Sequence, residues 1–153
     1  MVMYFELSTN ENLLMKKIFL VLMMMFATTC MFAQEMLRVE VVNIKKSSGF
    51  IRVGLFDNEK DFLKKAVLGK SVSANEGKVT VVFESIPAGE YAISVIHDEN
   101  NNEELDLNFL GIPKEGFGFG NDAKGAFGPP SFDKAKVKIG EAVVNNVITL
   151  RYF

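Results

Sequence analysis

The sequence predicts an all-β protein: a two-sheet antiparallel β-sandwich of the immunoglobulin-like or prealbumin-like kind, with about seven strands and one short helix. Two observations predict this class. Six segments between residues 37 and 152 alternate apolar and polar side chains, so each segment presents one face to a core and the other to water. Clusters of Gly, Pro, Asn and Ser separate these segments and mark turns.

This period of two predicts each strand along the chain. In the first, Leu37, Val39 and Val41 alternate with Arg38 and Glu40, and the other segments repeat the pattern. The predicted strands cover residues 37–41, 51–55, 79–83, 91–95, 135–139 and 148–152, with a candidate seventh near residues 70–72.

The connections have their own patterns. Residues 45–49 are expected to join the first two strands as a hairpin loop, and residues 86–89 suit a type I turn. Residues 59–66 are the one segment with a helical pattern, capped by Asp57 or Asn58. One long loop, rich in Asn, Gly and Phe, spans residues 98–133. A loop of this length in a compact domain is usually functional, and its phenylalanines argue against disorder.

Residues 1–34 are expected to be an N-terminal extension and a secretory signal peptide, ahead of one sandwich domain at 35–153. Two lysines precede an apolar run at 18–27, which leads into small residues. We expect translation to start at Met15 and cleavage to fall near Ala33 or Gln34, which predicts a periplasmic or secreted protein.

Two alternatives to a cleaved signal peptide stay open. A retained anchor needs a longer apolar run, because residues 18–27 are about half of a membrane-spanning helix. An outer-membrane lipoprotein acylated at Cys30 would place Thr29 where a smaller residue is usual. If the N-terminal segment is cleaved, the sequence predicts no transmembrane anchor in residues 35–153.

Charge and cysteine usage narrow the function classes. The formal net charge is −2, which is not the footprint of a nucleic-acid-binding protein. The single cysteine is Cys30, so residues 35–153 use no disulfide, thiolate metal site or cysteine nucleophile. A zinc site is not expected with one histidine.

The start of the long loop has the oxygen-ligand spacing of a calcium-binding loop. The candidate ligands fall at loop positions 1, 3, 5, 7 and 9, where Ca²⁺ finds hard oxygen donors. They are Asp98, Asn100, Asn102, Glu104 (through its backbone carbonyl) and Asp106.

Two departures weaken the calcium hypothesis. Glu103 stands at position 6, where the sharp turn normally needs Gly, and Phe109 stands at position 12 instead of a bidentate Glu. A closing carboxylate would come from elsewhere, such as Glu115 or Asp122. The alternative is a solvated acidic turn.

Further along the loop, glycines alternate with aromatic residues at 116–120, without the spacing of a nucleotide-binding loop. We expect these glycines to let the backbone bend while the aromatic rings pack beneath it. A second hypothesis is an aromatic platform for a ligand, made by Phe117, Phe119, Phe127 and Phe132.

His97 is the only histidine in the chain. Strand parity places it on the same face as Tyr91, Ile93 and Val95, so we expect a hydrogen-bonded histidine at the core edge. In the functional alternative it works with Asp98, and a hydrolase would use both. No nucleophile elbow motif supports that alternative.

Three motifs resemble the bacterial family known as domain of unknown function 2141. They are the His-Asp-x-Asn-x-Asn start at 97–102, the Gly-Ile-Pro-x-Glu-Gly segment at 111–116 and the Pro-Pro-Ser-Phe exit at 129–132. The likeness extends from Leu37 to Phe153. It implies an exported β-sandwich without an established activity. The turn at 86–91 is also similar to that of transthyretin-like and carboxypeptidase regulatory-like domains, which are non-catalytic.

Three functions follow as hypotheses. The first is a non-enzymatic exported module, stabilised by Ca²⁺ and binding an envelope or extracellular ligand through the long loop. The second is a small hydrolase that uses His97 with nearby carboxylates such as Asp98 and Glu115. The third is a purely structural envelope protein.

Overall fold

A computed structural model describes residues 14–20, 35–140 and 143–153. The chain divides into two compact units, residues 1–33 and 34–153. In the first unit, residues 14–20 are helical and exposed, while most of the predicted signal peptide, including its cleavage site, lies outside the described residues. Among the described residues, no helix is both long enough and apolar enough to cross a membrane.

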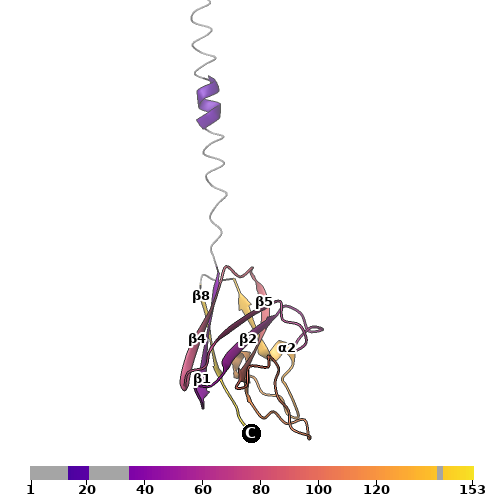
Figure 1. Cartoon of the computed structure of the whole chain (residues 1–153). Coiled ribbons are helices and arrows are strands. Elements are labelled where there is room, and N and C mark those ends of the chain that lie inside the picture. The colour runs from indigo at the N-terminus through magenta and orange to yellow at the C-terminus, as the bar shows by residue number, and fades with distance from the viewer. Residues whose placement is uncertain (1–13, 21–34, 141–142) are drawn as a thin grey trace, which may run out of the picture. The chain divides into compact units, whose positions relative to one another are not determined.

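The regular secondary structure of the second unit is almost entirely strand (Figure 1). Its elements, in chain order, are β1 (Met36–Ile44), β2 (Phe50–Phe56), β3 (Leu68–Ser73), β4 (Gly77–Glu84), β5 (Gly89–Asp98), β6 (Gly116–Phe119), the 3-10 turn η1 (Gly120–Asp122), α2 (Phe132–Ala135), β7 (Lys136–Ile139) and β8 (Val143–Thr149).

The strands form two sheets, which confirms the predicted all-β sandwich. One sheet has three strands in the order β4-β1-β8, and the other has five, in the order β3-β2-β5-β6 with β7 also paired to β5. All pairs are antiparallel except β1 with β8, which run parallel.

The core lies between the sheets, where the alternating apolar residues meet. Leu37, Val39 and Val41 of β1 are fully buried, opposite the buried Ile51 and Leu55 of β2 and their neighbours. A smaller aromatic cluster packs on the other side of the five-stranded sheet, around Phe56, Ala92, Phe119 and Ala135. The five-stranded sheet therefore carries apolar side chains on both faces.

Four sequence predictions are corrected. Residues 45–49 are not a hairpin loop, because β1 and β2 lie in different sheets. Residues 59–64 form successive turns instead of a helix, and Leu63 adopts a φ of 61°. Ala135 ends α2, so β7 begins one residue later than predicted, and β8 ends at Thr149. The long loop contains a further strand, β6, whose glycines hide the period of two.

Candidate functional site

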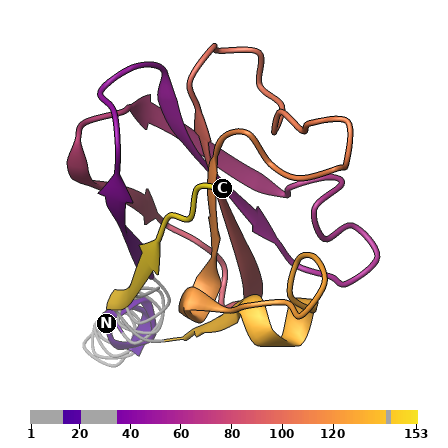
Figure 2. The ribbon, with the colours of Figure 1, turned by 90° about the horizontal axis from the view of Figure 1, so that it is seen from below.

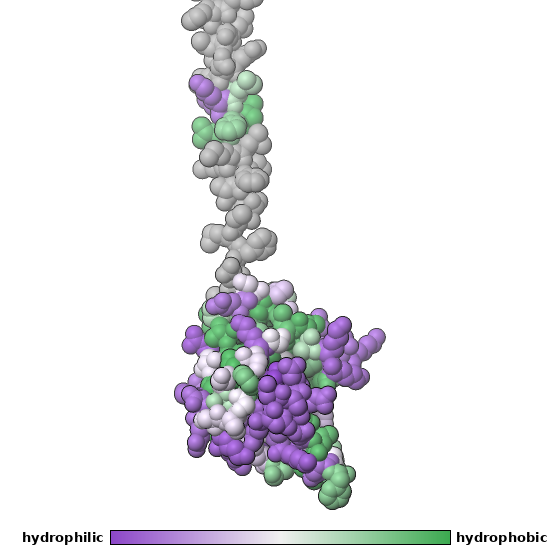
Figure 3. Space-filling view, in the orientation of Figure 1, coloured by the Kyte–Doolittle hydropathy of each residue, from purple (hydrophilic) through white to green (hydrophobic). Residues whose placement is uncertain are grey.

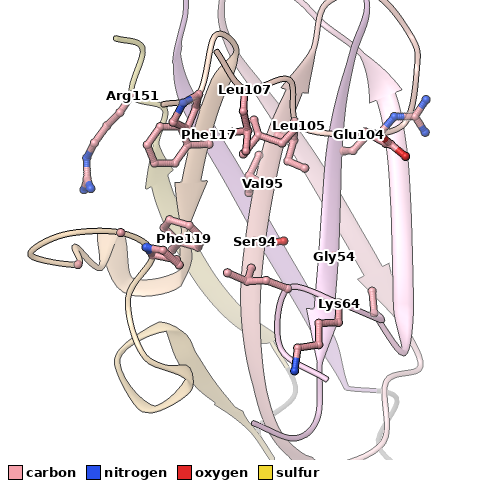
Figure 4. A pocket seen from close by; sticks show the side chains of 18 of the residues that line it. Gly54, Lys64, Ser94, Val95, Glu104, Leu105, Leu107, Phe117, Phe119 and Arg151 are labelled. Atoms are coloured by element: carbon pink, nitrogen blue, oxygen red, sulfur yellow. The ribbon is translucent and has the colours of Figure 1, made fainter. Parts of the chain in front are cut away.

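A groove runs along the outer face of the five-stranded sheet, the face turned away from the main core. Its floor is made of small residues on neighbouring strands. Gly54 of β2 lies opposite Gly69 of β3 on one side and Ser94 of β5 on the other. Glycine inside a strand usually marks a bulge or the close approach of another group. Phe56 and Ala66 approach Gly54 closely, whereas only the Val53 carbonyl oxygen lies near Gly69, so the floor is open at Gly69 (Figure 4).

Loops form the walls of the groove and gather on one side of the sandwich (Figure 2). They are the β2–β3 connection near Leu63, residues 103–113 of the long loop, residues 125–129 and the C-terminal residues Arg151 and Phe153. The groove has a volume of about 1450 Å³. Six large apolar side chains that line it are exposed: Leu63, Leu107, Leu110, Ile112, Phe127 and Phe153.

Three of the four predicted platform phenylalanines line this groove. Phe117 and Phe119 lie on one side of it, with ring centroids 5.9 Å apart, and Phe127 is fully exposed in the 125–129 loop (Figure 4). Phe132 does not line the groove. It packs edge-to-face on Phe62, with ring centroids 5.9 Å apart, and supports the aromatic cluster beneath.

Asp98, the first predicted calcium ligand, is fully buried at the end of β5. Its Oδ2 accepts a hydrogen bond from Arg52 Nε at 2.6 Å and one from the Glu103 N–H at 3.0 Å, while Oδ1 accepts from the Asn102 N–H at 3.1 Å. Burial alone would raise the pKa of Asp98, but these hydrogen bonds and the Arg52 charge lower the pKa below its usual value. Asp98 is therefore held ionised.

Three other predicted ligands come together beyond Asp98. The Asp106 carboxylate accepts hydrogen bonds from Asn100 Nδ2 at 2.7 Å and from Asn102 Nδ2 at 3.2 Å. Asn102 Oδ1 in turn accepts from the Glu104 N–H at 2.9 Å. The side chains of residues 100, 102 and 106 thus converge on one point, whereas the Glu104 side chain lines the groove (Figure 4).

Glu115 fastens this acidic turn, defined as residues 98–106, to the sandwich. It is 4 % exposed, its Oε1 accepts from the Glu99 N–H at 2.9 Å and its Oε2 from the Asp106 N–H at 3.0 Å. Asp122, the other proposed closing carboxylate, accepts instead from the Thr149 N–H. In the described part of the chain, no group of three or more His, Cys, Asp or Glu residues is spaced to hold a metal ion. Asparagine oxygens would have to complete any calcium site.

His97 lies where strand parity predicted, fully buried on the inner face of β5. Its Nε2 lies 2.8 Å from the Ser48 carbonyl oxygen, which can only accept, so Nε2 carries the proton. Nδ1 then accepts from the Tyr152 hydroxyl at 2.8 Å. Burial raises the pKa of Tyr152. Both ring nitrogens are engaged within the protein, so His97 fixes the C-terminal segment and does not face the groove.

The sequence reasoning missed the floor of the groove and most of its walls. Gly54 occupies an outward position of β2, where a solvent-facing strand normally carries a polar side chain. This glycine is the sequence signal from which a covered or binding face could have been predicted. The apolar run at 109–112 within a polar loop is a second signal.

Comparison with known proteins gives one match. No curated protein sequence and no solved structure is significantly similar to this chain. The profile of a bacterial family matches residues 39–146, which span β1 to most of β8 and include the acidic turn and the floor of the groove. The chain therefore belongs to the family described as "Uncharacterized protein conserved in bacteria (DUF2141)".

Proposed function

We propose that this protein is a non-enzymatic, exported β-sandwich module that binds an apolar ligand of the cell envelope or the extracellular medium. The observation that carries the proposal is the groove on the outer face of the five-stranded sheet, with a floor of Gly54, Gly69 and Ser94 and exposed apolar walls. A concave site with apolar walls and few polar groups is the usual form of a ligand-binding site.

The size of the groove supports a large or elongated ligand. Its volume of about 1450 Å³ exceeds the roughly 300–1000 Å³ of most small-molecule pockets. The charged groups along it are largely engaged with other protein groups. Arg52 bonds Asp98, and Arg151 NH2 donates to the Asp122 carbonyl oxygen at 3.1 Å. Binding would therefore depend mainly on burial of apolar surface.

The position of His97 favours binding over hydrolysis. A general base must lie within hydrogen-bond reach of the substrate proton that it removes. His97 is fully buried and bonded through both nitrogens, and Asp98 is bonded to Arg52. The hydrolase hypothesis would need both residues to leave these partners.

A second proposal concerns the acidic turn, which we infer to take up Ca²⁺. The convergence of Asn100, Asn102 and Asp106 supports it. The two asparagines point Nδ2 at Asp106, so a cation between them requires both amides to rotate and present their oxygens. Asp98 Oδ1 and the Glu104 carbonyl would complete the set. Because the turn leads into the groove wall, bound calcium would order that wall.

The groove can be tested by filling its floor. A Cβ added at Gly69 would meet only the Val53 carbonyl oxygen, at 3.8 Å, so the Cβ of Gly69→Leu overlaps nothing and the rest of the side chain extends from the floor of the groove. Gly140→Leu is the matched control, because nothing lies within 4 Å of a Cβ there and Gly140 is outside the groove. The probe is 1-anilinonaphthalene-8-sulfonate, whose fluorescence rises in apolar sites.

We expect saturable dye binding by the full-length chain and by Gly140→Leu, and affinity weakened about tenfold, or about 1.4 kcal/mol, in Gly69→Leu. Residues 1–34 are identical in all three proteins, so the difference reports the groove. Equal dye binding by both variants, with unchanged melting temperatures, would favour the purely structural alternative.

A further inference from the structure

The long loop ends in a compact turn, residues 107–113, that projects from the sandwich (Figure 1). An isolated bridge between Leu107 and Pro113 closes its base. The Asn108 N–H donates to the Ile112 carbonyl oxygen at 2.8 Å, and the Gly111 N–H donates to the Asn108 carbonyl oxygen at 2.9 Å. These bonds make the 107–113 turn a defined hairpin.

The Asn108 side chain satisfies much of the remaining backbone. Its Oδ1 accepts from the Leu110 N–H at 2.9 Å and from the Ile112 N–H at 3.0 Å. Pro113 has no N–H to satisfy. The N–H groups of Asn108, Leu110, Gly111 and Ile112 therefore all have partners inside the turn. The Phe109 N–H is the exception, with no partner among the described residues. Since an unpaired N–H costs several kcal/mol in the hydrocarbon core of a bilayer, this backbone suits the polar interface and not the core.

Large apolar side chains cover the outside of the same turn. Phe109 is 95 % exposed, Leu110 67 % and Leu107 51 %. Phe127, in the neighbouring 125–129 loop and lining the same groove as Leu107 and Leu110, is fully exposed. Phe109 and Phe127 are the most exposed large apolar side chains among the described residues. Green, the colour of hydrophobic residues, marks the end of the long loop in the space-filling view (Figure 3).

We propose that the 107–113 turn and Phe127 dock on a zwitterionic lipid bilayer by inserting Phe109 and Leu110 into its interface. This surface shares Leu107, Leu110 and Phe127 with the walls of the groove, whereas Phe109 does not line the groove. The charges around the turn select the type of lipid. Glu103, Glu104 and Asp106 precede the turn, Lys114 follows it, and Lys124 lies three residues before Phe127. The three carboxylates outnumber the two lysines, so an anionic membrane is not favoured. Insertion of apolar side chains is then the driving force.

A single tryptophan reports this insertion locally. The chain contains no Trp, so Phe109→Trp places its only indole on the 107–113 turn. Val147→Trp is the matched control, since Val147 is 55 % exposed on β8 of the other sheet. Both full-length variants are mixed with phosphatidylcholine vesicles, with and without bromine atoms on the acyl chains.

We expect the Phe109→Trp emission to shift to the blue and to be quenched by brominated lipid, with Val147→Trp unchanged. Adding Leu110→Ser to Phe109→Trp should weaken vesicle affinity about tenfold. Any anchoring by residues 1–34 is common to both variants and cannot produce a difference between them.

Three results would overturn the proposal. They are no shift at position 109, an equal shift at position 147, and a shift that grows with protein concentration without vesicles, which would indicate self-association through the turn. Dye binding by the same variants distinguishes failure of this proposal from failure of the proposed function. A Phe109→Trp protein that binds dye but does not bind vesicles leaves the proposed function intact.

Discussion

Glu103 adopts a left-handed backbone conformation, with a φ of 70°, at the position where a calcium-binding loop normally has Gly. The turn therefore keeps the expected shape without the expected residue. A residue with a Cβ pays about 1–2 kcal/mol for this conformation. Its surface ion pair with Arg52, 3.4 Å long with Glu103 mostly exposed, offsets only part of that cost.

Glu103→Gly should raise the free energy of unfolding by roughly 0.5–1 kcal/mol, because the relief of backbone strain exceeds the lost ion pair and the added flexibility of the unfolded chain. Urea denaturation measures the change. Glu104→Gly is the control, since Glu104 does not have a positive φ, and it should be destabilising. Stability lowered equally by both substitutions would mean that strain at Glu103 is negligible.

The Asp98–Arg52 pair should make the domain sensitive to acid. The folded-state pKa of Asp98 is lowered, so its contribution to stability is fully present above the unfolded-state pKa, near 3.9, and is lost as pH falls through the folded value. Asp98→Asn should lower stability by about 3 kcal/mol at pH 7. The loss should shrink below pH 4, and a deficit independent of pH would contradict the pairing.

Some of these residue-scale features were accessible from the sequence and others were not. Parity along 91–97 placed His97 correctly on the inner face, because successive side chains of a strand point to opposite faces whatever the strand packs against. The partnership of Asp98 with Arg52 was not predicted, because the two residues meet only through the pairing of β2 with β5.

At the scale of elements, the β1–β2 connection approaches the end of β5 closely. Gly49 has a φ of 71°, and a Cβ there would overlap the Asp98 carbonyl oxygen and lie 2.7 Å from Glu99 Cα. This contact positions the start of the acidic turn beside Ser48, whose carbonyl oxygen binds His97.

Gly49→Ala should destabilise the domain more than Gly77→Ala. Both glycines have a positive φ, but nothing lies within 4 Å of a Cβ at Gly77. Gly77→Ala should therefore cost only the roughly 1–2 kcal/mol of the left-handed conformation, and Gly49→Ala at least about 1 kcal/mol more for the overlap. Thermal unfolding compares the two, and equal losses would show that the approach of Gly49 to Asp98 is not tight.

Calcium uptake by the acidic turn should appear as a stabilisation. At ten times the dissociation constant, a ligand adds about 1.4 kcal/mol, which is a rise in melting temperature of roughly 5–6 °C for a domain of this size. Asp106→Asn should abolish the rise. Glu104→Gln should keep it, because the proposed ligand at position 104 is the backbone carbonyl. A melting temperature unchanged by millimolar Ca²⁺ in the parent chain would exclude the site.

Elements with a clean period of two were predicted well, and the failures have physical causes. In 59–66, Phe62 packs on Phe56 and Phe132, and Leu63 departs from helical geometry with a φ of 61°. Asn58 still caps the turn, since its Oδ1 accepts from the Asp61 N–H at 3.0 Å. The hairpin at 45–49 was wrong because a short loop can join strands of opposite sheets as easily as strands of one sheet.

At the scale of the whole molecule, the five-stranded sheet has two different faces. Its inner face completes the sandwich core, and its outer face combines a small aromatic cluster with an open floor flanked by loops. Sequence patterns predicted the sandwich because burial of one face dictates alternation. They did not predict the groove, because its floor comes from several strands and its walls come from four separate loops and terminal segments of the chain.

If the outer face of the five-stranded sheet binds an apolar ligand, the chemical shifts of its backbone amides must change on binding. Nuclear magnetic resonance spectra of the protein, recorded while 1-anilinonaphthalene-8-sulfonate is added, would follow each amide. We expect saturable shifts at Gly54, Gly69 and Ser94, with Gly140 and Val147 unchanged. Shifts that are absent from the three floor residues, or that map to the outer face of the three-stranded sheet, would contradict ligand binding in the groove.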